Sequence, residues 1–302
     1  MLRRLALFAL FHFAPARAQT LTLATYNIEN YCPANRMTAD GFRGDYPKPE
    51  AEKQALRAVI RSLGADVIVL QEIGPRPYLE ELRRDLAGEG LDYPHAIVVE
   101  AEDRDRHLGL LSKLPLKSVV RHTDLDFAYF GHREKVKRGL LEAVIATAAG
   151  DVTIFAVHLK SRLSDRADDP LSALRRAAEA TAVRDCILRL RPDPGAARYV
   201  ILGDCNDTRN SRTLQRLERR GQTVVAERLP AADSRGETWT EDFRREDTYT
   251  QLDHILVSPG LLAAVRDRRA RIFDGAGVAA ASDHRPLFVV LTVTGIVTSP
   301  AP

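Results

Sequence analysis

The sequence predicts an α/β fold in which two mixed β-sheets pack face to face and helices cover their outer sides, a four-layer α/β sandwich. Two observations support this prediction. Segments with the pattern of strands outnumber those with the pattern of helices, and the two kinds interleave along the chain. Several strand segments are continuous apolar runs, such as residues 67–70 and 199–202, which is typical of strands covered on both faces.

The first half of the chain contains strands separated by two helices. Residues 50–63 carry apolar side chains at helical spacing and stop at Gly64, and residues 77–86 form a second helix that ends before Gly88. Residues 33–49 are polar and contain glycine and proline, so a loop is expected there. Strands are predicted at residues 21–26, 67–70, 94–99, 107–112, 116–121, 139–147 and 152–157.

The second half contains the longest predicted helix, residues 171–190, which Arg191 and Pro192 close. The candidate site residues are spread from end to end, so residues 19–295 are expected to form one large domain, followed by a disordered tail at 296–302. A shorter helix is predicted at residues 211–220, and strands at residues 199–202, 252–257 and 286–293.

The first eighteen residues have the pattern of a secretory signal peptide. Met1 to Arg4 is short and basic, and ten residues follow that are apolar except for His12. The tripeptide at residues 16–18 fits the small-x-small rule for cleavage, so the mature protein is expected to begin at Gln19 and to be exported, to the periplasm or the extracellular space. Ten residues are too few to span a bilayer, and the alternative is a buried N-terminal helix.

Cleavage would remove three arginines and no acidic residue. The count of lysine plus arginine then falls from 44 to 41, against 41 acidic residues, and the formal net charge becomes zero. The pI of 8.8 therefore describes the precursor and is poor evidence for nucleic-acid binding. Cys32, Cys186 and Cys205 are too few for a disulfide scaffold or a thiolate metal site, although one disulfide could form in an oxidising compartment.

Polar residues lie at the ends of several predicted strands, and strand alternation is expected to send Asn27 and Glu29, and likewise Asp204 and Asn206, to the same side. Such positions indicate a site, because open sheets bind ligands at the ends of their strands. Each cluster alone has an ordinary structural explanation, such as a turn, a helix cap or a buried histidine, and only their joint occurrence favours function. The clusters are Tyr26-Asn27-Ile28-Glu29, Gln71-Glu72, His158-Leu159-Lys160, Gly203-Asp204-Cys205-Asn206, Leu252-Asp253-His254 and Ser282-Asp283-His284.

These residue types favour metal-assisted hydrolysis of a phosphate ester. Carboxylate and amide oxygens are the ligands that Mg²⁺, Mn²⁺ and Ca²⁺ prefer. His158 and His284 can act as acid or base near neutral pH, and Asp253 could orient an imidazole and stabilise its charged form. The chain has no Gly-x-Ser-x-Gly elbow, no cysteine in an activating motif and no glycine-rich phosphate loop, which disfavours covalent nucleophilic catalysis. Arg138, which opens a predicted strand, is expected to contact a phosphate.

In combination, the clusters resemble the motifs of the endonuclease/exonuclease/phosphatase superfamily, which includes deoxyribonuclease-like metal-dependent phosphoesterases. The resemblance runs from residue 21 to residue 291, nearly all of the mature chain, and implies the four-layer sandwich. The residues after His158 resemble a variant seen in secreted bacterial members, which favours that branch. The matching motifs are Tyr-Asn-Ile at 26–28, Leu-Gln-Glu at 70–72, Leu-Leu-Ser at 110–112, Val-His-Leu-Lys at 157–160, Gly-Asp-x-Asn at 203–206, Leu-Asp-His-Ile at 252–255 and Ser-Asp-His-Arg-Pro at 282–286.

The resemblance implies a metal ion at the first two and the last of these clusters. Glu72 corresponds to the principal metal ligand, with Asn27 and Glu29 beside it. Asp283 corresponds to a residue that binds a metal or supports the attacking water. The expected cofactor is Mg²⁺ or Mn²⁺, with Ca²⁺ as an alternative.

The resemblance also implies a catalytic role for five residues. Asp204 corresponds to the residue that orients or activates the attacking water, and Asn206 to the one that holds a phosphate oxygen. His284 corresponds to a general base paired with Asp253, and His158 to a second imidazole that faces the scissile phosphate.

The leading prediction is a secreted, metal-dependent phosphodiesterase with nucleic acid as the first choice of substrate, and Lys160 and Arg138 are expected to bind that substrate. A phosphomonoesterase or a phospholipid or inositol-phosphate headgroup hydrolase is the alternative, since zero net charge weakens the case for a polyanion. A catalytically inert binding module of the same fold is a second alternative. Neither stable membrane insertion nor a protein partner is predicted.

Overall fold

The computed structural model describes residues 18–38, 40–147 and 149–294. The predicted signal peptide lies outside the described residues except for Ala18, which opens the first strand, and the predicted tail at 296–302 lies wholly outside them. Within the described ranges, no helix is long and apolar enough to cross a membrane.

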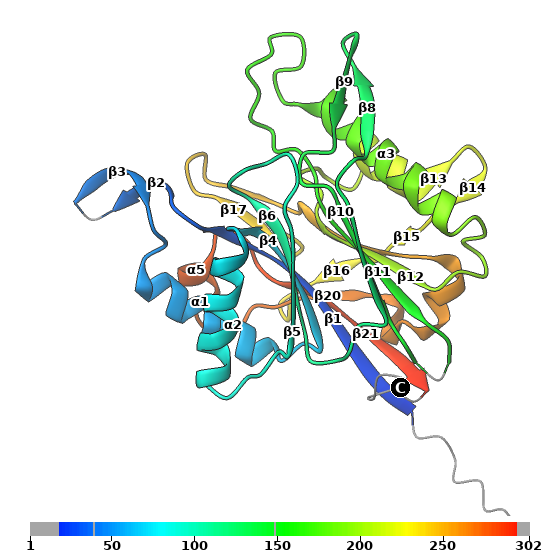
Figure 1. Cartoon of the computed structure of the whole chain (residues 1–302), viewed down its shortest axis with the longest axis horizontal. Helices are drawn as coiled ribbons and strands as arrows, with labels where there is room; N and C mark the ends of the chain where they lie inside the picture. The colour runs from blue at the N-terminus through cyan, green and yellow to red at the C-terminus, as the bar shows by residue number, and fades with distance from the viewer. Residues whose placement is uncertain (1–17, 39, 148, 295–302) are drawn as a thin grey trace, which may run out of the picture.

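Seven strands form the first sheet, and β1 runs through its middle (Figure 1). β1 pairs in parallel with β4 and antiparallel with β21, so the sheet is mixed as predicted. In spatial order the strands are β16 (Ala231–Ala232), β20 (Ala270–Ile272), β21 (Leu287–Thr294), β1 (Ala18–Tyr31), β4 (Val67–Ile73), β6 (His107–Ser112) and β5 (His95–Val99).

Six strands form the second sheet, which is also mixed. β11 pairs in parallel with β12 and antiparallel with β10. In spatial order the strands are β15 (Glu227–Arg228), β19 (Asp253–Val257), β12 (Tyr199–Asp204), β11 (Val152–His158), β10 (Leu140–Ile145) and β7 (Ser118–His122).

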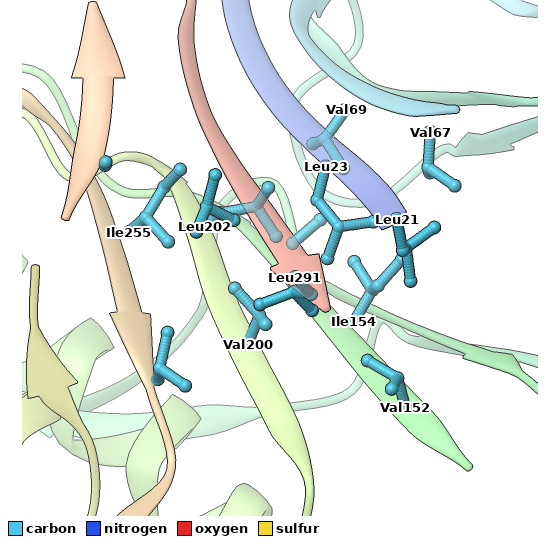
Figure 2. Close-up of a cluster of buried hydrophobic side chains, with 14 of the residues drawn as sticks. Leu21, Leu23, Val67, Val69, Val152, Ile154, Val200, Leu202, Ile255 and Leu291 are labelled. Atoms are coloured by element: carbon cyan, nitrogen blue, oxygen red, sulfur yellow. The ribbon is translucent and has the colours of Figure 1, made fainter. Parts of the chain in front are cut away.

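The largest buried cluster lies between the two sheets (Figure 2). Alternate residues of each strand point into this layer, because successive side chains of a strand face opposite sides. From the first sheet come Leu21 and Leu23, and from the second Val200 and Leu202, all with at most 1% of their surface exposed. Each sheet therefore has one face in the shared core and one face left for helices.

Helices cover both outer faces, which confirms the four-layer sandwich. Leu56 and Ile60 belong to the cluster on the outer side of the first sheet, and Val183 and Ile187 to the cluster on the outer side of the second. The first sheet is covered by α1 (Glu50–Leu63), α2 (Arg76–Gly88) and α5 (Val278–Ala281), and the second by α3 (Ala173–Leu190) and α4 (Arg212–Glu218). Two 3-10 helices, η1 (Pro259–Ala264) and η2 (Arg266–Arg268), precede β20.

The prediction of a loop at residues 33–49 was wrong, because a hairpin forms there. β2 (Ala34–Thr38) pairs with β3 (Gly41–Tyr46), and Figure 1 shows this hairpin standing away from the body of the molecule. The side chains of β3 are nearly all exposed, so this strand lacks the alternation by which strands are recognised, and β2 is only five residues long. Further hairpins join β8 (Asp126–Tyr129) to β9 (His132–Lys135), β13 (Arg219–Arg220) to β14 (Thr223–Val224) and β17 (Glu241–Phe243) to β18 (Thr248–Thr250).

The three cysteines do not form a disulfide. Cys32, Cys186 and Cys205 are all free and buried. Cys186 and Cys205 belong to the cluster beneath α3, where they pack as small apolar side chains.

Candidate active site

One end of the layer between the two sheets is polar rather than apolar. Along β1 the inward positions change from Leu21 and Leu23 to Asn27, and the inward positions of β11 and β12 end in His158 and Asp204. All three polar residues are at most 2% exposed. The strand alternation that fills the core therefore also brings polar side chains of both sheets together.

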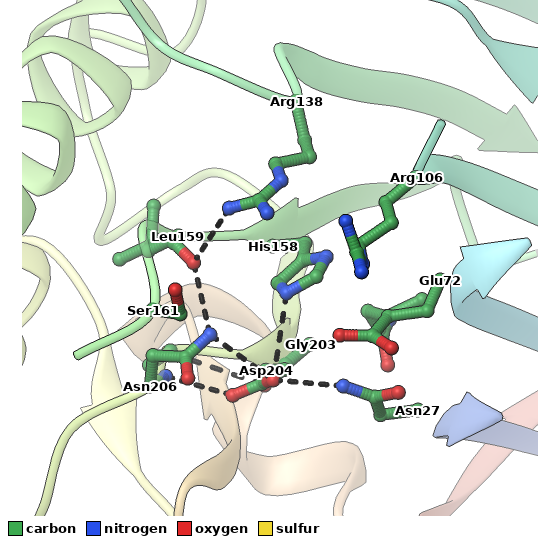
Figure 3. A network of polar contacts seen from close by, with 12 residues as sticks. Asn27, Glu72, Arg106, Arg138, His158, Leu159, Ser161, Gly203, Asp204 and Asn206 are labelled. Carbon is green, nitrogen blue, oxygen red and sulfur yellow. Dashed lines mark hydrogen bonds and ion pairs between the residues drawn. The ribbon is translucent and has the colours of Figure 1, made fainter. Parts of the chain in front are cut away.

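The two strands of the first sheet that reach the site are bulged. The register of β1 shifts between Asn27 and Tyr31, and the register of β4 shifts at Glu72. Glu29, Asn30 and Glu72 have φ angles of 47°, 53° and 62°, a left-handed conformation that costs roughly 1–3 kcal/mol for residues with a side chain. The bulge in β4 brings the Glu72 carboxylate beside Asn27, where its Oε2 accepts a hydrogen bond from the backbone N–H of Asn30 at 3.0 Å (Figure 3).

The carboxylate of Asp204 contacts three other side chains of the site. Its Oδ2 accepts hydrogen bonds from the side-chain amides of Asn27 at 3.0 Å and Asn206 at 3.2 Å, and lies 3.6 Å from Nε2 of His158 (Figure 3). Its Oδ1 accepts from the backbone N–H of Asn206 at 2.7 Å. Burial, together with the charge of Asp253, raises the pKa of Asp204 to about 7. The carboxyl group can therefore exchange a proton near neutral pH.

Asn206 lies beside Asp204, as the sequence predicted, but strand alternation is not the cause. β12 ends at Asp204, and Asn206 has a left-handed backbone with a φ of 51°. A tight turn, closed by the hydrogen bond from the backbone N–H of Asn206 to the carboxylate of Asp204, returns the Asn206 side chain to the site. Its Nδ2 also donates to the carbonyl of Leu159 at 3.0 Å.

His284 forms a close pair with Asp253. Nδ1 of the imidazole lies 2.8 Å from Oδ2 of the carboxylate, and both side chains are buried. Burial opposes the charged imidazole, but the charge and hydrogen bond of Asp253 outweigh it, aided by Asp283 and Asp204, so the pKa of His284 is raised well above its usual value. Ser282 ties this segment to β1, because its hydroxyl donates to the carbonyl of Asn27 at 2.8 Å.

His158 is held in the opposite charge state. Burial, reinforced by the charges of Arg138, His284 and Arg106, lowers the pKa of His158 well below its usual value. Its Nδ1 is buried and has no hydrogen-bond partner among the residues that the structure describes. A buried polar atom without a partner is costly, and such atoms are typical of sites that a ligand completes.

Two arginines flank His158, and sequence reasoning found only one of them. Arg138, the predicted phosphate contact, is buried, and its Nη2 lies 2.9 Å from Oδ2 of Asp103. Arg106 also points toward His158 and Glu72 (Figure 3), and its Nε donates to the side chain of Asn30 at 2.6 Å. The signal that could have found Arg106 is its position, since it directly precedes β6.

Lys160 lies at the rim of the site and is half-buried. Its Nζ donates to the carbonyl and the hydroxyl of Ser161 at 3.2 and 3.1 Å and also bonds the carbonyl of Leu163. Burial, followed by the charge of Arg138, lowers the pKa of Lys160 to about 8.

Glu29 and Asp283 form a separate acidic pair. Oε2 of Glu29 accepts a hydrogen bond from the backbone N–H of Asp283 at 3.1 Å. Burial and the charge of Asp283 raise the pKa of Glu29, and Lys48 and Arg244 oppose the rise. The i, i+2 relation with Asn27 is again a turn, in which Oδ1 of Asn27 accepts from the backbone N–H of Glu29 at 3.1 Å.

The donor set of Asn27 and Glu72 fits a hard divalent cation. In the described ranges, no three side chains of His, Cys, Asp or Glu lie close enough together to form a metal cluster. Mg²⁺ needs no such cage, since it is commonly held by one or two carboxylates and keeps several of its waters. Glu72 is partly exposed and has no ion-pair partner in the part of the chain that the structure describes, so its Oε1 is available to a cation while Oε2 accepts from Asn30.

A four-layer sandwich with this site at one end of its inter-sheet core is the architecture of the metal-dependent phosphoesterases. The sequence profile of the Endonuclease/Exonuclease/phosphatase family matches residues 24–284, and the chain belongs to that family. Members of the family are hydrolases that act on phosphoester bonds and typically use divalent metals. No curated protein sequence matches the chain.

Solved structures share the fold over nearly their whole length. An endonuclease/exonuclease/phosphatase from Bacteroides vulgatus is 19% identical with a TM-score of 0.64, over 91% of this chain and 99% of that one. Sphingomyelinase C from Streptomyces griseocarneus is 16% identical with a TM-score of 0.60, over 90% and 99%. A variant of beta toxin from Staphylococcus aureus with bound magnesium ions is 14% identical with a TM-score of 0.61, over 90% and 99%. At these identities the likeness establishes the fold.

Proposed function

We propose that the protein is an exported, divalent-metal-dependent phosphodiesterase that hydrolyses nucleic acid with an activated water. The observation that carries this proposal is the pair of imidazoles beside Asp204. The raised pKa of His284 favours its charged form, whereas the lowered pKa of His158 favours its neutral form. Together with a carboxyl group whose pKa is about 7, they provide an acid, a base and a neutral hydrogen-bonding group around one phosphate.

Glu72 and Asn27 are the residues that would hold the divalent cation. A bound cation would supply neutralisation of the phosphate charge and polarise one phosphate oxygen. The Glu29 carboxylate is bonded to the backbone of Asp283, and among the described residues no three acidic side chains form a metal cluster, so we assign Glu29 and Asp283 a supporting role rather than direct ligation.

Asp204 would orient the attacking water and accept its proton, because burial raises its pKa into the neutral range. The amides of Asn27 and Asn206 hold this carboxylate in place. His284 would donate a hydrogen bond or a proton to the phosphate, which reverses the general-base role that the resemblance implies, because a charged imidazole cannot accept a proton. Asp253 keeps that imidazole charged and oriented.

The cations around His158 favour a polyanionic substrate. Arg106 has no carboxylate within ion-pair distance among the described residues, and Lys160 likewise bonds only neutral oxygens there. Arg106 and Arg138 lie beside His158 (Figure 3), and Lys160 lies at the rim of the site, so three positive side chains would surround a phosphate bound there. Local contacts of this kind can bind neighbouring phosphates even when the net charge of the mature protein is zero.

The test compares four substrates under three metal conditions. Protein starting at Gln19 is assayed on plasmid DNA, RNA, bis-p-nitrophenyl phosphate and p-nitrophenyl phosphate, each with Mg²⁺, Mn²⁺ or EDTA. We expect metal-dependent cleavage of nucleic acid and of the diester, and none with His284→Ala. Activity on DNA or RNA should fall steeply with salt, whereas activity on the small diester should not.

Other outcomes would redirect the proposal. Cleavage of small esters with nucleic acid untouched would indicate a phosphatase or headgroup hydrolase. Inactivity on all substrates, with no Mn²⁺ or Mg²⁺ binding by calorimetry, would leave the inert binding module. N-terminal sequencing of protein recovered from culture medium and periplasm would test export, which requires a mature terminus at Gln19.

The distribution of exposed apolar side chains supports a second candidate, hydrolysis of lipid headgroups. Of ten large apolar side chains that are exposed in the described ranges, nine lie on three protrusions, and only Val120 lies elsewhere. Met37 is 79% exposed and Leu163 is 81% exposed. The protrusions are hairpin β2–β3, hairpin β8–β9 with the adjoining residues 163–174, and hairpin β17–β18.

Two of these protrusions are anchored directly to the site. Arg36 of β2 donates to the carbonyl of Asn30, and the backbone N–H of Asp242 in β17 donates to the carbonyl of Asp283 at 2.8 Å. Sedimentation with phosphatidylcholine vesicles tests this candidate. Binding that Met37→Ser weakens and Val120→Ser leaves intact would favour the lipid substrate, and no binding would remove it.

A further inference from the structure

A single peptide bond next to His158 joins three parts of the site. The carbonyl of Leu159 accepts hydrogen bonds from Nδ2 of Asn206 at 3.0 Å and from Nη1 of Arg138 at 3.5 Å (Figure 3). The N–H on the other side of the same peptide bond belongs to Lys160, and it donates to Oε2 of Glu179 at 2.7 Å.

Glu179 is fully buried on α3, outside the set of residues already assigned to the site. Its second oxygen, Oε1, accepts from the backbone N–H of Lys137 at 3.2 Å. The Glu179 carboxylate therefore bonds the backbone of Lys137, which directly precedes Arg138, and the backbone of Lys160, which directly follows Leu159. Lys137 lies just before β10 and Lys160 just after β11, so Glu179 bridges the segments that flank these two neighbouring strands.

We propose that Glu179 is a positioning residue of the phosphoesterase site, which acts through the Leu159–Lys160 peptide bond on Asn206 and Arg138. A peptide bond is planar, so an acceptor that fixes its N–H also fixes the direction of its carbonyl. Hydrogen bonds to a charged acceptor are among the strongest in proteins, and a buried N–H without an acceptor is costly. This inference rests on the proposed function, because it assigns Asn206 and Arg138 to the handling of the phosphate.

The carbonyl of Leu159 determines which way the Asn206 amide faces. If the peptide turned, Nδ2 of Asn206 would lose one of its two acceptors, and Arg138 would keep Asp103 but lose its contact beside His158. We therefore expect kcat to fall while the protein stays folded, because small displacements of positioned groups can lower a rate about 100-fold.

A graded pair of variants tests the proposal. Glu179→Gln keeps one good acceptor, and Glu179→Met keeps the length of the side chain without an acceptor. With bis-p-nitrophenyl phosphate we expect kcat to fall about 10-fold for Gln and about 100-fold for Met, with KM changed by less than about 3-fold. Glu142→Gln is the matched control, because Glu142 is a buried carboxylate of β10 that pairs with Arg191 at the end of α3 and does not contact the site, and it should keep full activity.

A double-mutant cycle separates positioning from general support of the fold. If Glu179 acts through Asn206 and Arg138, then Glu179→Met should cause a clearly smaller loss of kcat in an Asn206→Ala background, because only the contact of Arg138 is left to disturb. A full, additive loss in that background, or equal losses for Glu179→Met and the Glu142→Gln control, would overturn the proposal.

A second readout does not depend on activity. Amide hydrogen exchange at Lys160 and Lys137, followed by NMR, should be slow in the wild type and faster in Glu179→Met, while amides of the remote strand β7 stay unchanged. Unchanged exchange at Lys160 in Glu179→Met would show that Glu179 does not hold this N–H, and would reject the proposal. A wild type that shows slow exchange but hydrolyses none of the esters would instead reject the proposed function.

Discussion

The two sheets place their site residues in different ways. The second sheet supplies His158, Asp204 and Asp253 from the terminal positions of regular strands. The first sheet supplies Asn27 and Glu72 from strands that bulge and contain left-handed residues. Regular strands orient side chains by alternation alone, whereas bulges orient them through backbone conformations that cost free energy. The half of the site that handles protons therefore takes these three residues along the preference of the backbone, with His284 added from the segment before β21, whereas the half proposed to hold the metal is built against that preference.

The largest effect should follow from breaking the half that handles protons. Asp253→Asn removes the charge that holds His284 in its protonated form, and we expect kcat to fall about 10⁴-fold, as in other buried carboxylate–histidine pairs. Initial rates with bis-p-nitrophenyl phosphate measure this. Asp66→Asn, at the opposite end of the first sheet, serves as the control. A loss smaller than about 10-fold would show that the pair is structural.

The different placement also explains how far the sequence predicted the site. The four-layer fold and the strands of both sheets followed from periodicity, and the pairing of Asp253 with an imidazole followed from residue chemistry. The relation of Asn27 to Glu29, and of Asp204 to Asn206, was attributed to alternation, but both pairs are joined by turns with left-handed residues. Such turns leave no periodic signal, because hydrophobic patterns report which face of a strand is buried and not its backbone angles.

Two residues that reach the site from other parts of the chain were not predicted from the sequence, for a related reason. Arg106 and Glu179 reach the site from a loop and a helix that are distant in sequence from the residues they contact. A charged residue in a loop or on a helix is ordinarily solvated, so composition gives no reason to select these two among 85 charged residues. Their importance depends on burial and on contacts that only the folded chain defines.

The next largest effect should come from the first sheet and should appear in metal binding. Glu72→Gln should weaken Mg²⁺ or Mn²⁺ binding about 100-fold, because a hard cation loses its charged oxygen ligand. Glu29→Gln should change the affinity much less, since the Glu29 carboxylate is bonded to the backbone of Asp283. Isothermal titration calorimetry on both variants decides the matter. Equal losses would place Glu29 at the metal and join the two acidic groups into one site.

The pH dependence should report Asp204 from the second sheet. Burial raises the pKa of this carboxyl to about 7, so below that value its base form is depleted, and kcat/KM should fall about 10-fold per pH unit. The sign follows from the role, because the ionised carboxylate accepts the proton of water. A bound cation would favour the ionised form and move the midpoint lower, so profiles should be recorded at two metal concentrations. A flat profile between pH 5 and about 7 would exclude Asp204 as the base.

The smallest effect, on stability, tests whether the bulged half is strained. Glu29 combines a φ of 47° with a buried charge beside Asp283, which raises its pKa, so both its backbone and its carboxylate oppose folding. Glu29→Gly relieves both and should increase the free energy of unfolding by about 1 kcal/mol in EDTA, measured by urea denaturation. Glu29→Gln removes only the charge, and the difference between the two variants gives the backbone contribution. Val120→Gly, in the regular strand β7, should instead lower stability by about 1 kcal/mol, because glycine weakens an unstrained strand. Equal losses of stability in both glycine variants would show that the bulge in β1 stores no backbone strain. The two halves of the site would then differ in backbone geometry but not in conformational free energy.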